Sequence, residues 1–224
     1  MTGASSGIGA EIARDLARRG HGVSLVARRE DRLRALADEL HGDHGVRCEV
    51  LVADLADEAE RRDLVSRVGD LGLTVEVLVN NAGFSTMGPV HRSEPEREVA
   101  MLRTDVEAVA HLCSLCTPGM VERGRGAVLN VASTAAFQPV PGQAGYSGSK
   151  AFVLAYTRAL RAELAGTGVG VTVLCPGPVE TGFVEAAGID EGEATSAMPS
   201  FMWVSAEAVA HRGGVGSGPR ATRW

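Results

Sequence analysis

GVSLVA, residues 22–27, is the first of five short apolar runs that decide the fold. Each run is rich in valine and leucine, as expected of strands buried on both faces of a parallel sheet. The other four runs are CEVLVA (48–53), VEVLV (75–79), GAVLNVA (126–132) and VGVTVLC (169–175). Helical patterns occupy residues 7–20, 29–41, 56–69, 94–123 and 144–166. This repeated alternation predicts an α/β fold with right-handed crossovers.

The composition is that of one globular domain. The chain has 224 residues, of which 45% are hydrophobic and 22% charged, enough for a single sizeable core. Its net charge of −6 argues against nucleic acid or an anionic membrane as the main partner. No apolar stretch reaches eighteen residues and no signal-peptide pattern is present, so a cytoplasmic location is expected. We predict one domain over residues 1–210 and a disordered, glycine- and arginine-rich tail over 211–224.

The four cysteines do not show the paired spacing of a disulfide framework or a zinc site. They are Cys48, Cys113, Cys116 and Cys175. Cys113 and Cys116 form a CxxC, but this pair lies within an amphipathic run with no companion histidine or cysteine nearby. Reduced thiols and no metal site are the expectation, with a redox role for the CxxC as the alternative.

Lys150 is the only lysine in the chain, against twenty-one arginines, and it follows Tyr146 by four residues. A site that needed only a cation would be expected to hold arginine in this composition, so position 150 requires an amine. In a helix, this spacing places the ammonium and the phenol one turn apart on one face. A neighbouring ammonium favours the phenolate, which suits a group that exchanges a proton near neutral pH.

The glycine-rich stretch TGASSGIG, residues 2–9, opens the chain. Its glycines leave room for a pyrophosphate, and a helix beginning near Gly7 would direct its free N–H groups at that charge. A flexible N-terminus is the alternative. A phosphate-binding turn needs a strand to feed it, and no apolar run precedes this one, so the first strand of the sheet is expected to be missing. The predicted cofactor contacts here are Gly3, Ser5, Ser6, Gly7, Ile8 and Gly9.

Charged residues follow the first two apolar runs. Arg28 and Arg29 stand where a protein that prefers NAD would present an acid to the ribose hydroxyls. Two arginines there favour a 2′-phosphate and hence NADP, unless they only form a solvated helix start. Asp54 and Leu55 are placed to bracket an adenine edge, although Asp54 is equally suited to cap the next helix.

Small and polar residues follow the remaining runs. The sequence NNAG (80–83) fits a strand end that approaches a cofactor closely, or a simple turn. Ser133 stands thirteen residues before Tyr146, near enough for both hydroxyls to face one carbonyl oxygen. PGPVET (176–181) breaks the chain into a loop after the last run.

Taken together, TGASSGIG, NNAG, Ser133, YSGSK (146–150) and PGPVET resemble the short-chain dehydrogenase/reductase family over residues 2–210. The resemblance implies a Rossmann-type doubly wound parallel sheet with helices on both faces. It also implies an NADP-dependent enzyme, less well suited to NAD, that transfers a hydride between the nicotinamide and a carbonyl or secondary alcohol.

The same resemblance implies a role for each site residue. Tyr146 would be the general acid and base, Lys150 would tune it and bind the nicotinamide ribose, and Ser133 would hold the substrate oxygen. Further cofactor contacts would come from Asn81, Ala82, Gly83, Pro176, Gly177, Val179 and Thr181, with Val179 and Thr181 at the carboxamide.

The chain departs from the family pattern in two respects. Asp105 stands where the family has an asparagine in its proton relay, so the NH2 donor is lost and a charge is added. We therefore predict impaired proton shuttling. The first and last strands of the sheet are also expected to be missing, which leaves two other interpretations: a nucleotide-binding protein without turnover, and a fragment that does not fold alone.

The sequence says less about substrate and assembly. Residues 183–203, which include Phe201 and Trp203, either form an apolar wall around a medium-sized substrate or pack as an ordinary loop. The predicted substrate is therefore a fairly apolar carbonyl or alcohol. The helices over 94–123 and 144–166 correspond to the usual dimer surface of the family, so the resemblance implies a homodimer or homotetramer.

Overall fold

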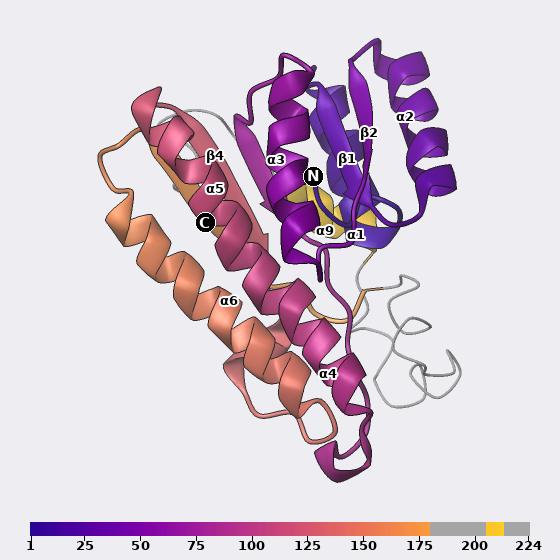
Figure 1. Ribbon diagram of the computed structural model, residues 1–224, viewed down its shortest axis with the longest axis vertical. Coiled ribbons are helices and arrows are strands. Elements are labelled where there is room, and N and C mark those ends of the chain that lie inside the picture. The colour runs from indigo at the N-terminus through magenta and orange to yellow at the C-terminus, as the bar shows by residue number, and fades with distance from the viewer. Residues whose placement is uncertain (180–204, 213–224) are drawn as a thin grey trace.

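The computed structural model describes residues 1–179 and 205–212, and Figure 1 shows their arrangement. In chain order the elements are α1 (Gly7–Arg18), β1 (Val23–Ala27), α2 (Glu30–His44), β2 (Cys48–Val52), α3 (Glu58–Asp70), β3 (Val77–Asn80), η1 (Val90–Arg92), α4 (Pro95–Leu102), η2 (Arg103–Glu107), α5 (Ala108–Glu122), β4 (Gly126–Val131), η3 (Thr134–Phe137), α6 (Ala144–Glu163), β5 (Val169–Leu174) and α9 (Ala206–Arg212). All five predicted strands are present, so the α/β prediction is confirmed.

The helix predicted over 94–123 forms as three consecutive segments. A π-helical stretch, η2, separates α4 from α5 and contains the buried Asp105. Such a stretch inserts an extra residue into a helix and often marks a functional site. The predicted disordered tail overlaps α9, because that helix runs to Arg212. Residues 213–224, and with them the expected missing last strand, lie outside the described residues.

Within residues 1–179 and 205–212, every pairing between named strands is parallel, and the strands form two sheets rather than one continuous sheet. β1 pairs with β2, while β3, β4 and β5 pair in that order. Met1 and Thr2 connect the two sheets, because the Thr2 N–H donates to Val79 O at 3.0 Å and Thr2 bridges Val26 in parallel. Thr2 therefore lies between β1 and β3, at the junction of the two sheets.

Alternate strand residues point to opposite faces, and helices cover both. Leu25, Val79 and Leu129 belong to a core cluster shared with α1 and α2. Val128 and Val171 belong to the cluster on the other face, which includes residues of α3 and α5. Helices therefore lie on both faces of the strands, as predicted for a doubly wound fold. Among the described residues, no helix is both long enough and apolar enough to cross a membrane.

The CxxC pair lies within the core. Cys113 and Cys116 are both buried on α5, and burial raises the pKa of each thiol to about 11. Cys113 also contacts the buried side-chain amides of Asn80 and Asn130, which bond to each other at 2.9 Å. A thiol with so high a pKa is a weak nucleophile at neutral pH, so these side chains serve packing.

We expect the thiols to react in two groups with a disulfide reagent at pH 8. Cys48 and Cys175 are partly exposed and should be labelled in the native protein, whereas Cys113 and Cys116 should react only after unfolding. Mass spectrometry of digested, labelled protein identifies the modified positions. Rapid native labelling of Cys113 or Cys116 would contradict the packing described here.

Candidate active site

The predicted Tyr146 and Lys150 lie one turn apart on α6, and both side chains are buried. Tyr146 is 9% exposed and Lys150 is 5% exposed. The Lys150 ammonium lies 5.5 Å from the centroid of the Tyr146 ring. Two buried polar side chains on the same face of one helix fit a shared chemical role better than a solvated surface.

Ser133 lies beside this helix. It precedes η3, where its hydroxyl oxygen accepts a hydrogen bond from Ala135 N at 3.2 Å, and η3 packs against α6. β4 ends two residues earlier, at Val131, whose carbonyl oxygen lies 3.4 Å from the Lys150 ammonium. The structure therefore places Ser133 and Lys150 at the carboxyl end of β4, the edge where open α/β sheets bind ligands.

Asp105 forms a direct ion pair with Lys150. Its Oδ2 atom lies 3.0 Å from the Lys150 ammonium, and the Asp105 side chain is fully buried. Its Oδ1 atom accepts a hydrogen bond from Phe84 N at 3.1 Å. The carboxylate is thereby fixed between η2, α6 and the loop after β3.

Burial and pairing act against each other in this ion pair. Burial raises the pKa of Asp105, and the nearby Lys150 and Phe84 N–H offset this only in part. For Lys150, burial opposes the charge, but the Asp105 carboxylate and Tyr146 outweigh it, so the pKa of Lys150 is raised. Lys150 is therefore a firmly held cation whose nearest charged partner is a carboxylate.

Gly83 is required at its position by this carboxylate. A Cβ atom on Gly83 would lie 2.9 Å from Asp105 Oδ1 and 3.0 Å from Oδ2. Both distances are shorter than normal contacts, so any side chain would displace the carboxylate or the loop. The Phe84 N–H binds the Asp105 carboxylate, and Gly83 leaves the space that the carboxylate occupies. The sequence analysis did not predict that either residue would position Asp105.

The glycine-rich stretch forms a tight turn against the loop after β3. Gly3 has a φ of 65°, a conformation that favours glycine. A Cβ atom on Gly9 would lie 2.1 Å from the carbonyl oxygen of Gly3. The Asn81 amide donates to the carbonyl oxygens of Thr2 and Gly3. These contacts join two predicted cofactor-binding segments, the glycine-rich stretch and NNAG (80–83), into one surface.

Thr2 is a second residue that sequence reasoning left out of the candidate site. Its hydroxyl accepts hydrogen bonds from Asn81 N at 3.0 Å and Ala82 N at 3.1 Å, and donates to Val79 O at 3.2 Å. It is 3% exposed. The sequence did offer one signal: Thr2 directly precedes the first glycine of the stretch, and a threonine hydroxyl can both donate to and accept from backbone groups where two loops meet.

The start of α1 is well suited to an anion. Ser6 occupies the N-cap position without a side-chain capping bond, and the first turn contains no acidic residue. The Ser5 and Ser6 hydroxyls instead accept hydrogen bonds from Arg29, each at 2.8 Å. Arg29, at the carboxyl end of β1, thus places its guanidinium beside the free N–H groups of a helix, a favourable site for phosphate.

The structure contradicts one of the two interpretations of Asp54, its role as an N-cap. The N-cap of α3 is Asp57, whose side chain accepts from Glu60 N, so the N-cap interpretation of Asp54 is wrong. The reason is that β2 is followed by a short turn, in which Asp54 Oδ1 accepts from Ala56 N at 3.0 Å. Asp54 Oδ2 also lies 3.9 Å from the guanidinium of the exposed Arg28.

The remaining predicted cofactor contacts lie after β2 and after β5, and the structure describes only some of them. The Leu55 side chain is 5% exposed and packs in the core, and its carbonyl oxygen accepts from Arg61 at 2.7 Å. Pro176 O accepts from Thr134 N at 2.9 Å, which holds the loop after β5 against η3. Gly177 follows it and Val179 is buried. Thr181 and the substrate segment 183–203 lie outside the described residues.

Comparisons with known proteins agree with this geometry. The family model described as short chain dehydrogenase matches residues 1–192, so the chain belongs to the short-chain dehydrogenase family. The chain is 37% identical over 187 residues to the very-long-chain 3-oxoacyl-CoA reductase of Anas platyrhynchos, covering 81% of this chain and 59% of that relative. It is 36% identical over 180 residues to an NADP-dependent 3-hydroxy acid dehydrogenase of Salmonella typhi, covering 80% and 71%.

The same fold is found among solved structures. A short-chain dehydrogenase from Sphingobium yanoikuyae in complex with NADPH superposes with a TM-score of 0.86 at 34% identity, over 94% of this chain and 80% of that one. The Rossmann-type fold is thus shown. The chain spans 59% of the length of two of its curated relatives.

Proposed function

We propose that this chain is an NADP(H)-dependent oxidoreductase that interconverts a carbonyl compound and a secondary alcohol. The observation that carries the proposal is the buried pair of Tyr146 and Lys150 on α6, beside Ser133 at the carboxyl end of β4. The NADPH bound to the Sphingobium yanoikuyae relative and the NADP dependence named for the Salmonella typhi relative support this choice of cofactor.

The described residues fit a dinucleotide. The turn around Gly3 and Gly9 leaves no room for side chains, and the start of α1 offers free N–H groups to a pyrophosphate. Arg29, held by Ser5 and Ser6, is placed to pair with a 2′-phosphate. When bound, the nicotinamide would supply the hydride.

The protein's own side chains would supply proton transfer and positioning. Tyr146 would donate its hydroxyl proton to the carbonyl oxygen during reduction and would take it back during oxidation. Lys150 would favour the phenolate by its charge, and Ser133 would hold the substrate oxygen by a hydrogen bond. Asp105 would keep Lys150 protonated while drawing the ammonium toward η2.

Cofactor binding and turnover test the proposal separately. NADPH fluorescence titration measures binding, and NADPH oxidation across a panel of ketones and 3-oxoacyl thioesters measures turnover. We expect NADPH to bind more tightly than NADH, and at least one apolar ketone or 3-oxoacyl compound to be reduced. No binding of either cofactor would overturn the proposal.

Arg29 is expected to determine the preference for NADP. In the variant Arg29→Ala, the 2′-phosphate loses a charged hydrogen-bonding partner, so the Kd for NADPH should rise about 10- to 100-fold while the Kd for NADH changes little. Arg32→Ala is the matched control, because it removes the same charge from an exposed position on α2. Equal losses in both variants would show that Arg29 acts only through overall charge.

A second candidate function is nucleotide binding without turnover. Asp105 favours it, because its carboxylate holds the ammonium directly at 3.0 Å, where the resemblance implies an uncharged amide. Tight NADPH binding with no turnover across the panel, in both the unaltered chain and the variant Asp105→Asn, would favour this candidate over catalysis.

We further propose a cytoplasmic homodimer or homotetramer with a fairly apolar substrate. Exposed apolar side chains on α4, α5 and α6 support the assembly: Val99, Leu102, Val121 and Phe152 are each between 37% and 46% exposed. Sedimentation equilibrium at micromolar concentration measures the oligomeric state. The residues proposed to contact substrate, within 183–203, would be tested by activity against ketones of increasing apolar size.

A further inference from the structure

Arg61 of α3 is a fully buried cation that the proposed proton transfer does not use. Its guanidinium donates from Nη1 to Leu55 O at 2.7 Å and from Nε to His111 Nδ1 at 3.2 Å. From Nη2 it pairs with the Glu107 carboxylate. Arginine is almost never fully buried unless it is paired, and here three nitrogens have partners. Arg61 therefore connects the turn after β2 with η2 and α5.

Two ion pairs hold η2 from different sides. Asp105 and Glu107 both belong to this π-helical stretch, and each binds a different helix. Asp105 pairs with Lys150 of α6, whereas Glu107 pairs with Arg61 of α3. Side chains two residues apart on a helix do not face the same direction, so the two pairs bind η2 to different neighbours. The position of Asp105 therefore depends on both.

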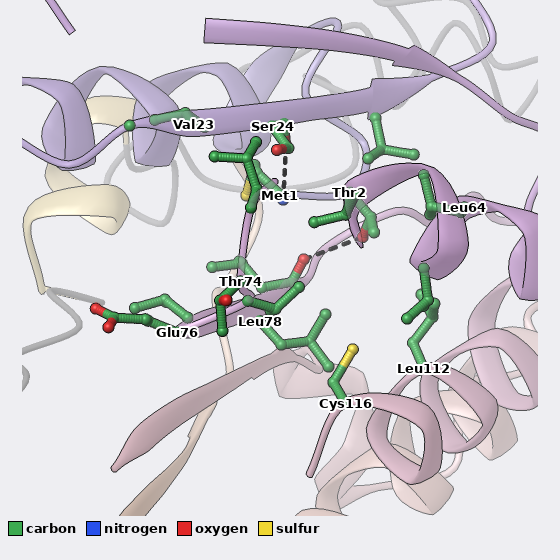
Figure 2. A pocket seen from close by; sticks show the side chains of 18 of the residues that line it. Met1, Thr2, Val23, Ser24, Leu64, Thr74, Glu76, Leu78, Leu112 and Cys116 are labelled. Carbon is green, nitrogen blue, oxygen red and sulfur yellow. Dashed lines mark hydrogen bonds between the residues drawn. The ribbon is translucent and has the colours of Figure 1, made fainter. Parts of the chain in front are cut away.

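Apolar packing contributes little to the position of η2. Of its five residues, only Asp105 is buried. Nearby, Leu64 of α3 and Leu112 of α5 share one core cluster, but both also line a largely apolar cavity of about 310 Å³ between β1 and β3, as Figure 2 shows. Protein interiors are otherwise close-packed, so the apolar contact between α3 and α5 is less complete here. Directed polar contacts are therefore the main constraint on η2.

We propose that Arg61 is a positioning residue: through Glu107 it holds η2 where the Asp105 carboxylate reaches Lys150. Arg61 is itself fixed, because Leu55, whose carbonyl oxygen it binds, packs in the core after β2. The guanidinium thus extends the fixed position of the sheet to η2. The role of this contact in turnover rests on the proposed function, whereas the position of the carboxylate does not.

Two amides in the loop after β3 report separately on this position. The Phe84 N–H donates to Asp105 Oδ1 at 3.1 Å, whereas the Asn81 N–H donates to Thr2 Oγ1 at 3.0 Å. Neither bond includes Arg61. If η2 moves, the carboxylate leaves the Phe84 amide, which then exchanges faster with solvent, while the Asn81 amide stays bound.

Two matched double variants of the full chain test the proposal by hydrogen exchange of backbone amides, measured by NMR. The buried-pair variant, Arg61→Met with Glu107→Gln, removes both charges and so leaves no unpaired buried charge, which would itself destabilise the fold. The exposed-pair control, Arg62→Met with Glu58→Gln, makes the same two changes on the same helix, in an ion pair of 2.9 Å. Exposed ion pairs contribute little to stability, so the control should change little.

We expect exchange of the Phe84 amide to become about 10- to 100-fold faster in the buried-pair variant. The Asn81 amide of the same chain should change by less than about threefold, and both amides should stay within about twofold in the exposed-pair control. A general loss of stability would accelerate both amides together. The ratio of the two exchange rates therefore isolates the position of Asp105.

The pH dependence of kcat gives a second readout. Burial lowers the pKa of Lys150, but Asp105 and Tyr146 outweigh it, so the pKa is raised. A carboxylate that moves away from Lys150 lets this pKa fall, so the cation is lost at a lower pH. We expect the alkaline limb of the kcat profile to move down by about one pH unit in the buried-pair variant and to stay in place in the control. Absence of turnover in every chain would contradict the proposed function, whereas the exchange rates would still test the role of Arg61.

Three results would overturn the proposal. Equal Phe84 exchange in the buried-pair variant and the control would show that Asp105 keeps its place without Arg61. Equal acceleration of the Phe84 and Asn81 amides would show a general loosening of the fold. A shifted kcat profile with unchanged Phe84 exchange would show that Arg61 acts by its charge alone. If the buried-pair variant does not fold, Glu107→Gln alone carries the same comparison, because it removes the ion pair and keeps an acceptor oxygen for Arg61.

Discussion

Replacing Tyr146 with phenylalanine is expected to lower kcat by about 10²- to 10⁴-fold, the usual contribution of a positioned general acid or base. The substitution removes only the hydroxyl, and the 9% exposed ring keeps its packing on α6. Without that hydroxyl, the carbonyl oxygen has no proton donor next to Lys150. The measurement is NADPH oxidation with the best substrate of the panel, together with NADPH affinity and the melting temperature, which should both change little.

The chain offers an exact control, because Tyr156 is its only other tyrosine. It lies on the same helix, its ring stacks on Phe152 with centroids 5.5 Å apart, and burial raises the pKa of Tyr156 to about 12. Tyr156→Phe should therefore leave kcat within about twofold of the unaltered chain. If Tyr146→Phe retained more than a third of the activity, its assignment as general acid would be wrong.

The second large effect is expected at Asp105. In the variant Asp105→Asn, Oδ1 still accepts from Phe84 N, but the NH2 group that replaces Oδ2 cannot attract the Lys150 ammonium. Lys150 is then released toward Tyr146, whose ring centroid is 5.5 Å away. We expect kcat to rise about tenfold, which corresponds to roughly 1.4 kcal/mol of the barrier.

This gain should be accompanied by a loss of stability. The variant leaves Lys150 as a buried cation with no carboxylate at 3.0 Å, and breaking a buried pair typically costs about 3–5 kcal/mol when one partner is removed. The retained amide oxygen should keep the cost toward the lower end. Thermal melting and steady-state kinetics measure both quantities in the same protein.

Two comparisons separate this explanation from a general structural effect. Lys150→Met should lower kcat by at least about 100-fold, because the ammonium itself is removed. In that variant the buried Asp105 can take up a proton, since burial already raises its pKa. If Asp105→Asn left turnover unchanged while Lys150→Met abolished it, Asp105 would hold the helix geometry without influencing the proton transfer.

Much of the fold could be predicted from the sequence because the signals are local. Each apolar run formed a strand within a few residues of its predicted bounds, since a strand buried on both faces needs continuous valine and leucine. The cofactor-facing loops followed from the same reasoning, because the carboxyl ends of parallel strands share one edge of the sheet. The π-helical η2 could not be predicted in this way, since one extra residue within a long helical run leaves little trace in the local pattern of apolar residues.

Contacts between distant segments were less accessible. The sequence placed Arg28 and Arg29 together, but only the structure separates them, with Arg29 bound to Ser5 and Ser6 and Arg28 near Asp54. Similarly, the residue type of Asp54 suits an N-cap, yet Asp57 is the N-cap of α3. The reason is that β2 ends at Val52 and α3 begins only at Glu58, so a turn that contains Asp54 separates them.

The sequence by itself determined the order of strands and helices, the position of Tyr146 and Lys150 on one helix face, and the family. These properties depend on residue type and spacing along one segment. Only the tertiary structure decided that Asp105 lies 3.0 Å from Lys150, that Thr2 joins the glycine-rich turn to Asn81 and Ala82, and that a cavity separates β1 from β3. Each of these depends on how far apart remote segments pack, and local sequence patterns do not specify that distance.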